Sequence, residues 1–90
     1  MVQYEIIISG KVQGVGFRFF TRNQARQLNL TGWVRNTLDG GVLATVQGPK
    51  QAITTFVDFL SVGPPLSDVK SVTKIEMQLI EKFTDFEVRD

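Results

Sequence analysis

The dipeptide Asp39-Gly40, followed by a second glycine, lies between two strand-like segments and constrains the fold more than any other feature. These segments are "LTGWVRNTL" (residues 30–38) and "VLATVQ" (residues 42–47). Asp-Gly between two such segments is the strongest short-range signal for a β-hairpin. The centre of the chain is therefore predicted to form two antiparallel strands joined by a tight turn.

A strand and a helix are predicted before this hairpin. Residues 2–9, "VQYEIIIS", partly alternate and are rich in β-branched side chains, which is typical of a strand. From about residue 17 to residue 28 the apolar side chains recur with a helical period, and Arg22 and Arg26 fall on the other side. Asn29 tolerates the left-handed conformation that ends many helices, so the helix is expected to stop there. The expected buried side consists of Phe17, Phe20, Ala25 and Leu28.

A second helix and two further strands are predicted after the hairpin. Gly48-Pro49 opens the helix, because proline suits a first helical turn. "GPPLSD" (residues 63–68) ends it. Residues 69–80 contain an alternating strand pattern, and residues 83–90 predict a short last strand. The expected buried stripe of the second helix consists of Ala52, Ile53, Phe56, Phe59 and Leu60.

The resulting order, β-α-β-β-α-β with a terminal strand, predicts an α+β fold of the ferredoxin-like, split βαβ type. We expect an antiparallel sheet with both helices on one face, because the crossovers are right-handed. The length fits a single domain over residues 1–90. In this topology the first two strands are parallel with one strand between them. The segment after Ser9 should therefore lie roughly 10 Å from Arg35, Asn36 and Thr37.

The composition removes several chemistries. Cysteine and histidine are both absent, so the chain has no thiol nucleophile and lacks the commonest general base and metal ligand. No histidine is available to activate Ser9, Thr21 or Thr37. No carboxylate cluster or pair predicts a metal site or a paired-carboxylate mechanism. The residues therefore suggest no metal site.

The distribution of charge and of apolar residues limits the partners. Residues 1–45 hold five Lys/Arg against two Asp/Glu, yet the net charge of the whole chain is only +1. A nucleic-acid-binding domain would usually be more basic. The longest apolar run, residues 6–8, cannot span a membrane, and Glu5 interrupts any early signal-like stretch. We expect a cytoplasmic protein that binds neither nucleic acid nor membrane.

The most unusual segment is "GKVQGVGFRFF" (residues 10–20), which places three glycines before an arginine. It is not a Walker A loop, and the dinucleotide pattern fails because its third glycine position is Phe19. A glycine-rich turn before a helix can direct several backbone N–H groups toward one anion, and Arg18 can bind two of its oxygens. The alternative is a simple tight turn beside a solvated arginine.

These groups suit phosphoryl transfer from a substrate with a good leaving group. Its loose transition state needs charge stabilisation and a positioned water more than a covalent nucleophile. Asn36 is the amide that the topology places beside the glycine segment. From the residues alone, Asn36 could equally be a strand-end asparagine that bonds its neighbours.

Two motifs carry a family resemblance. "GKVQGVGFRFFTRNQA" followed by "LNLTGWVRNTLDGGV" resembles the acylphosphatases, whose pattern runs G-x-V-Q-G-V-x-F-R and then G-W-V-[RK]-N before a D-G turn. The likeness continues through "VQGP", "GPPLSDVKSV" and the final "FEVRD", and so covers nearly the whole chain. The main departure is Asn29, where the family usually has glycine.

The resemblance implies a small, monomeric cytosolic hydrolase of small acyl phosphates that yields a carboxylate and inorganic phosphate and uses no metal and no cofactor. It assigns Arg18 to binding and orienting the phosphate and Asn36 to holding the attacking water. It also implies that the loop surrounds the phosphate or a similar anion with backbone N–H groups. The loop positions concerned are Gln13, Gly14, Val15, Gly16, Phe17 and Arg18.

Three alternatives share the predicted topology. An RNA-binding module would stack bases on aromatic side chains of the first and third strands, where only Tyr4 is aromatic. A non-catalytic acylphosphatase-like domain occurs within larger carbamoyl-transfer proteins, but this chain ends at residue 90 without a linker, so we expect a free-standing enzyme. An anion sensor would bind phosphate without turnover. The sequence leaves open whether Phe19, which lies off the apolar stripe, lines the site or covers a sheet edge.

Overall fold

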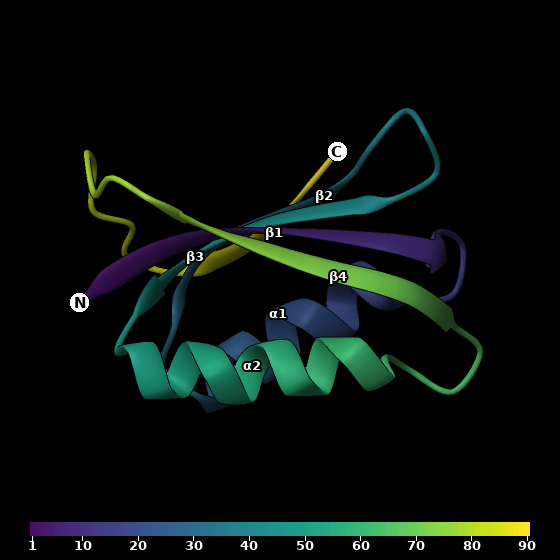
Figure 1. The fold of residues 1–90 in the computed structure, drawn as a ribbon, viewed down its shortest axis with the longest axis horizontal. Helices are drawn as coiled ribbons and strands as arrows, with labels where there is room; N and C mark the ends of the chain where they lie inside the picture. Colours follow the sequence, from purple (N-terminus) through teal and green to yellow (C-terminus); the bar gives the residue numbers. More distant parts are fainter.

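Helices and strands follow one another in the predicted order. The computed structural model describes all residues from Met1 to Asp90. Its strands form one sheet, and α1 and α2 cover the same face of it (Figure 1). The elements are β1 (Val2–Lys11), α1 (Phe17–Gln27), β2 (Thr31–Asn36), β3 (Val42–Gly48), α2 (Lys50–Val62), β4 (Asp68–Met77) and β5 (Phe86–Arg89).

The strand order in the sheet is β4-β1-β3-β2-β5. β1 pairs antiparallel with both β3 and β4, and β2 pairs antiparallel with β3. β1 and β2 are therefore parallel, with β3 between them, which confirms the ferredoxin-like, split βαβ arrangement. β5 adds to β2 as a parallel strand, so the sheet is mixed rather than wholly antiparallel.

The core lies between the sheet and the two helices. Strand side chains alternate between the two faces, so Ile6 and Ile8 of β1 point toward the helices and Ile7 points away. Each fully buried aliphatic or aromatic side chain contributes about 1.5–3 kcal/mol of transfer free energy. The buried apolar residues are Tyr4, Ile6, Ile8, Val12, Phe17, Ala25, Leu30, Val34, Val42, Ala44, Val46, Ile53, Phe56, Leu60 and Phe86.

The first helix ends as predicted, because Asn29 has a left-handed φ of 57°. Its buried face also contains Thr21, which the apolar pattern missed because the residue is polar. The Thr21 hydroxyl donates a hydrogen bond to the carbonyl oxygen of Phe17 at 2.8 Å. This bond satisfies the hydroxyl, so a polar side chain is accepted in the core.

Three expectations about the second half were wrong in detail. Phe59 was expected in the buried stripe of α2 but is 44% exposed, because it lies at the margin of that stripe. Pro49 precedes the helix with an extended ψ of 139° instead of occupying its first turn. β4 ends at Met77, so residues 78–80 continue the alternating pattern without pairing in the sheet.

This topology brings two turns to one end of the sheet. The glycine loop leaves the carboxyl end of β1, and the β2–β3 hairpin leaves the carboxyl end of β2 (Figure 1). The amino end of α1 lies beside them because the loop leads directly into it. Every sequence-predicted site residue therefore belongs to this end of the molecule.

Candidate active site

The loop of residues 12–16 joins β1 to α1 and depends on two glycines. Gly14 has a φ of 73° and Gly16 a φ of 78°, which side-chain-bearing residues rarely adopt. A Cβ at either position would meet no atom within 4 Å. The glycines are therefore required by the backbone conformation and not by close packing.

This loop leaves its backbone donors unused. No backbone N–H from Gln13 to Phe19 donates a hydrogen bond to another group of the chain, and Gly16, the N-cap of α1, provides no side-chain cap. The first N–H groups of any helix need an external acceptor, and the helix dipole makes an anion favourable there. The loop and the helix start together form a set of donors available to one anion.

The side chain of Gln13 holds the loop against the hairpin. Its Nε2 donates hydrogen bonds to the carbonyl oxygens of Thr37, at 2.7 Å, and of Gly41, at 2.8 Å. Each such bond contributes about 1 kcal/mol to stability. The amide thus fixes the distance between the two turns, while the loop's own backbone donors stay free.

Arg18, in the first turn of α1, is held by the carboxyl end of the chain. Its Nη1 donates a hydrogen bond to the carbonyl oxygen of Arg89 at 2.9 Å and lies 3.7 Å from Oδ1 of Asp90. Both contacts use the same nitrogen, so the rest of the planar guanidinium can serve another acceptor. The side chain is 27% exposed, which places it between the interior and the solvent.

The free donors and Arg18 surround a small cavity. Its volume is about 100 Å³, the room that a few water molecules or one small anion take. Arg18 and Asn36 both line it, although they come from different elements. The lining residues are Val12, Gly14, Gly16, Phe17, Arg18, Phe19 and Asn36.

The cavity contains most of the loop residues that the sequence selected. Gly14, Gly16 and Phe17 line it, whereas Gln13 and Val15 do not. Phe19 also lines the cavity, which is one of the two placements that the sequence left open. Its only signal in the sequence was a large apolar residue off the buried stripe of α1.

The three hydroxyl side chains near the predicted site do not reach this cavity. Ser9 pairs with the hydroxyl of Ser71, and Thr21 is buried against the backbone of α1. Thr37 belongs to the hairpin turn, where its hydroxyl bonds the Asp39 carboxylate. Nowhere in the chain do three or more His, Cys, Asp or Glu side chains form a group that could hold a metal ion.

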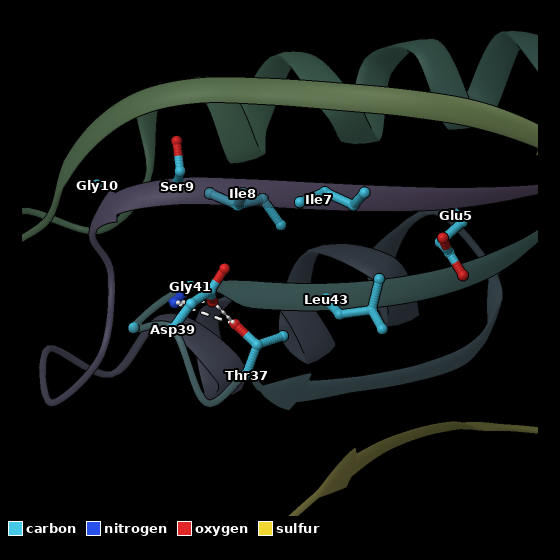
Figure 2. Close-up of a pocket in the computed structure, with 10 residues that line it drawn as sticks. Glu5, Ile7, Ile8, Ser9, Gly10, Thr37, Asp39, Gly41 and Leu43 are labelled. Atoms are coloured by element: carbon cyan, nitrogen blue, oxygen red, sulfur yellow. Dashed lines mark hydrogen bonds between the residues drawn. The ribbon is translucent and has the colours of Figure 1, made fainter.

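A larger hollow of about 270 Å³ lies on the sheet face away from the helices (Figure 2). Ile7 and Leu43, which are paired in register, lie between Glu5 at one end and the hairpin turn at the other. The Asp39 carboxylate at that turn accepts hydrogen bonds from the Thr37 hydroxyl and, at 3.2 Å, from the Gly41 N–H. The Thr37 bond first, and the Gly41 bond second, hold the pKa of Asp39 below its ordinary value.

The outer sheet face does not resemble an RNA-binding surface. Tyr4 is 6% exposed and belongs to the core, so no aromatic side chain of β1 is available for stacking. β3 contains no aromatic residue. Base stacking on these two strands, which RNA-recognition domains of this topology use, has no platform here.

Comparison with known proteins relates the chain to one protein family. The family model described as Acylphosphatase matches residues 4–88. An acylphosphatase from Syntrophotalea carbinolica is 45% identical over 89 residues, which cover 98% of this chain and 96% of that protein. An acylphosphatase from Bifidobacterium longum is 44% identical over 82 residues, covering 91% of this chain and 84% of the relative.

Solved structures give the same result for the fold. The crystal structure of acylphosphatase from Bacillus subtilis superposes with a TM-score of 0.96 at 39% identity and covers all of both chains. The structure of HypF from T. kodakarensis matches with a TM-score of 0.87 at 33% identity, but only over 12% of its own length. No helix of this chain is long and apolar enough to cross a membrane.

Proposed function

The chain belongs to the acylphosphatase family, and from this we propose that the cavity beside Gly14 and Gly16 binds the phosphate of its substrate. The enzyme hydrolyses the carboxyl–phosphate bond of small acyl phosphates to a carboxylate and inorganic phosphate. The observation that carries the proposal is the convergence of unused backbone donors and the Arg18 guanidinium on one cavity.

In this proposal the phosphate sits at the amino end of α1. Its equatorial oxygens accept hydrogen bonds from the loop N–H groups and from the guanidinium of Arg18. These donors stabilise the charge that spreads over the oxygens in a loose transition state. Because Arg89 and Asp90 already hold one nitrogen of the guanidinium, Arg18 is positioned before the substrate arrives.

Asn36 positions the attacking water. Asn36 lines the cavity from the end of β2, whereas Arg18 lines it from α1, so a water bound to the Asn36 amide lies beside the phosphorus atom. The new bond forms between the water oxygen and phosphorus. The bond between phosphorus and the acyl oxygen breaks, and the carboxylate leaves with that electron pair. One proton of the water passes to a phosphate oxygen, which gives dihydrogen phosphate.

This chemistry fits the side chains that are present. A carboxylate is a good leaving group and needs no acid to protonate it, so the absence of histidine, cysteine and a carboxylate pair is no obstacle. The proposal therefore includes no metal and no cofactor. It further describes a monomeric, single-domain enzyme of residues 1–90 that acts in the cytoplasm. Light scattering on the purified protein tests the monomer.

The experiment measures hydrolysis of acetyl phosphate with excess EDTA and inhibition by inorganic phosphate. The wild-type protein should turn over under these conditions, and Arg18→Ala should lose about 10³-fold or more in kcat/KM and bind phosphate more weakly. Arg26→Ala is the matched control. Arg26 also joins α1 to the last segment, through Asp85 at 3.1 Å, but it lies outside the cavity. Unchanged turnover and phosphate inhibition in Arg18→Ala would refute the proposal.

A further inference from the structure

The cavity can hold the phosphate of an acyl phosphate but not the acyl group as well. Its volume of about 100 Å³ is the space of only a few water molecules. The acyl group must therefore extend out of it, along one of two sides. One side is the hairpin, where Asn36 also lines a wide groove of about 610 Å³. The other side is the first turn of α1, where Phe19 lines the cavity.

The geometry of the reaction distinguishes these two sides. In phosphoryl transfer the attacking and leaving oxygens lie roughly in line through phosphorus. This step rests on the proposed function, in which Asn36 of β2 holds the attacking water. The leaving oxygen, and the acyl group attached to it, then points away from Asn36, so its neighbours are lining residues that do not belong to β2. The wide groove lies on the side of the water and not of the leaving group.

Phe19 has the properties of a contact for an apolar acyl group. The residue is 52% exposed, although it is a large aromatic side chain in the first turn of α1. Helical side chains lean toward the amino end of their helix, which carries the ring toward the loop. The guanidinium of Arg22 lies 5.1 Å from the ring centroid, a cation–π contact that supports the ring from the following turn.

The groove on the other side is less suited to an acyl group. Three charged side chains line it, those of Arg35, Asp39 and Asp90, and charged groups do not suit an apolar acyl group. Leu38 is its only large apolar residue and is fully exposed. Leu38 therefore offers a matched control, since it is an exposed apolar side chain that lines the groove beside Asn36 and not the cavity.

We propose that Phe19 is a specificity-determining residue that contacts the acyl group, and that the enzyme favours acyl phosphates with aromatic or bulky aliphatic acyl groups. Contact with the ring removes apolar surface of a bulky acyl group from water. The methyl group of acetyl phosphate has little apolar surface to bury, so it gains little from this contact. The phosphate contacts are separate from this one, so binding of inorganic phosphate does not depend on the ring.

The test compares benzoyl phosphate with acetyl phosphate. In Phe19→Ala, the ratio of kcat/KM for benzoyl phosphate to kcat/KM for acetyl phosphate should fall about 5- to 20-fold, mainly through a higher KM for benzoyl phosphate. Inhibition by inorganic phosphate is measured in parallel and reports any change in the backbone donors of the loop. Phe19→Leu should recover part of the loss, because it restores apolar surface without the ring.

Two controls keep the result specific. Leu38→Ala tests the hairpin side, and Phe59→Ala removes an aromatic ring of similar exposure, 44%, from α2. Neither should change the ratio of the two substrates. Equal losses on both substrates in Phe19→Ala, no loss on benzoyl phosphate, or a selective loss in Leu38→Ala would each overturn the inference while leaving the phosphate site intact. A wild-type protein that hydrolyses neither substrate would refute the proposed function, and this inference with it.

Discussion

Two glycine-containing turns lie at the same end of the sheet and use their backbone donors in opposite ways. The hairpin turn between β2 and β3 pairs its donors internally: Gly40 N–H bonds the carbonyl of Thr37, and Gly41 N–H bonds the Thr37 hydroxyl and the Asp39 carboxylate. The loop between β1 and α1 pairs none from Gln13 onward. Both turns need glycine at positive φ, so the local conformation is not what separates them.

The difference indicates that the two turns have different roles: the hairpin holds the loop in place, and the loop keeps its donors free. The hairpin is complete in itself and also accepts both hydrogen bonds from the Gln13 side chain. The loop is held in place by the hairpin and does not use its own backbone for that purpose. A turn whose shape is fixed from outside can keep its donors free for a ligand, which is the preorganisation that electrostatic catalysis requires.

After Arg18→Ala, the largest effect is expected from substitution of Asn36, the one cavity residue that belongs to the β2–β3 hairpin. Asn36→Ala should lower kcat about 10²- to 10³-fold, because the attacking water loses its positioning amide. Inhibition by inorganic phosphate should remain close to that of the wild type, since the loop and Arg18 are unchanged. Steady-state kinetics with phosphate as competitor measures both. An active Asn36→Ala enzyme would remove the hairpin side from the mechanism.

A matched pair of glycine substitutions tests the comparison itself. Gly16 in the loop and Gly40 in the hairpin both have positive φ, 78° and 92°, and a Cβ added at either position would meet no atom within 4 Å. Gly16→Ala and Gly40→Ala should therefore cost similar stability, about 1–2 kcal/mol. Their enzymatic activities, in contrast, should differ.

The loop variant displaces phosphate-binding donors, so Gly16→Ala should lose about 10- to 100-fold in kcat/KM. Gly40→Ala should stay within about threefold, because its turn contributes no donor to the cavity. Chemical denaturation and acetyl phosphate hydrolysis give the two readouts. Equal activity losses would mean that the two turns do not differ in function.

The smallest expected effect is the change in thermal stability of Asp39→Ala with pH. Because hydrogen bonds from Thr37 and Gly41 lower the pKa of Asp39, its ionised form stabilises the hairpin. That contribution is complete above the ordinary pKa of 3.8 and is lost as the pH falls through the lowered value. Asp39→Ala should therefore lower Tm by a few degrees at pH 7, and by less once the pH has fallen through the lowered pKa. A Tm difference that does not shrink in acid would contradict this role.

The fold could be predicted from the sequence because its signals are local. The Asp39-Gly40 turn, the helical period after Phe17 and the tolerance of Asn29 for a left-handed φ each depend on neighbouring residues. The topology then followed from general rules of connection and handedness. The parallel pairing of β5 with β2 did not, since nothing near residue 86 indicates which strand it joins.

The site was predictable to the same extent. Arg18 and Asn36 meet in one cavity because parallel β1 and β2 end at the same edge, which the topology predicts. The contact of Arg18 with Arg89 joins residues 71 positions apart and depends on how β5 docks. The bonds from the Gln13 side chain and the placement of Phe19 likewise depend on tertiary packing, which a local pattern does not encode.

The central claim is that the backbone donors from Gln13 to Phe19 bind the phosphate. A titration of the isotope-labelled protein with inorganic phosphate, followed by amide NMR, tests it most directly. The amide resonances of this loop should shift in a saturable way, those of Gly40 and Gly41 should stay nearly fixed, and Arg18→Ala should weaken the response. Shifts confined to the hairpin or to the outer sheet face, with the loop unchanged, would contradict the account.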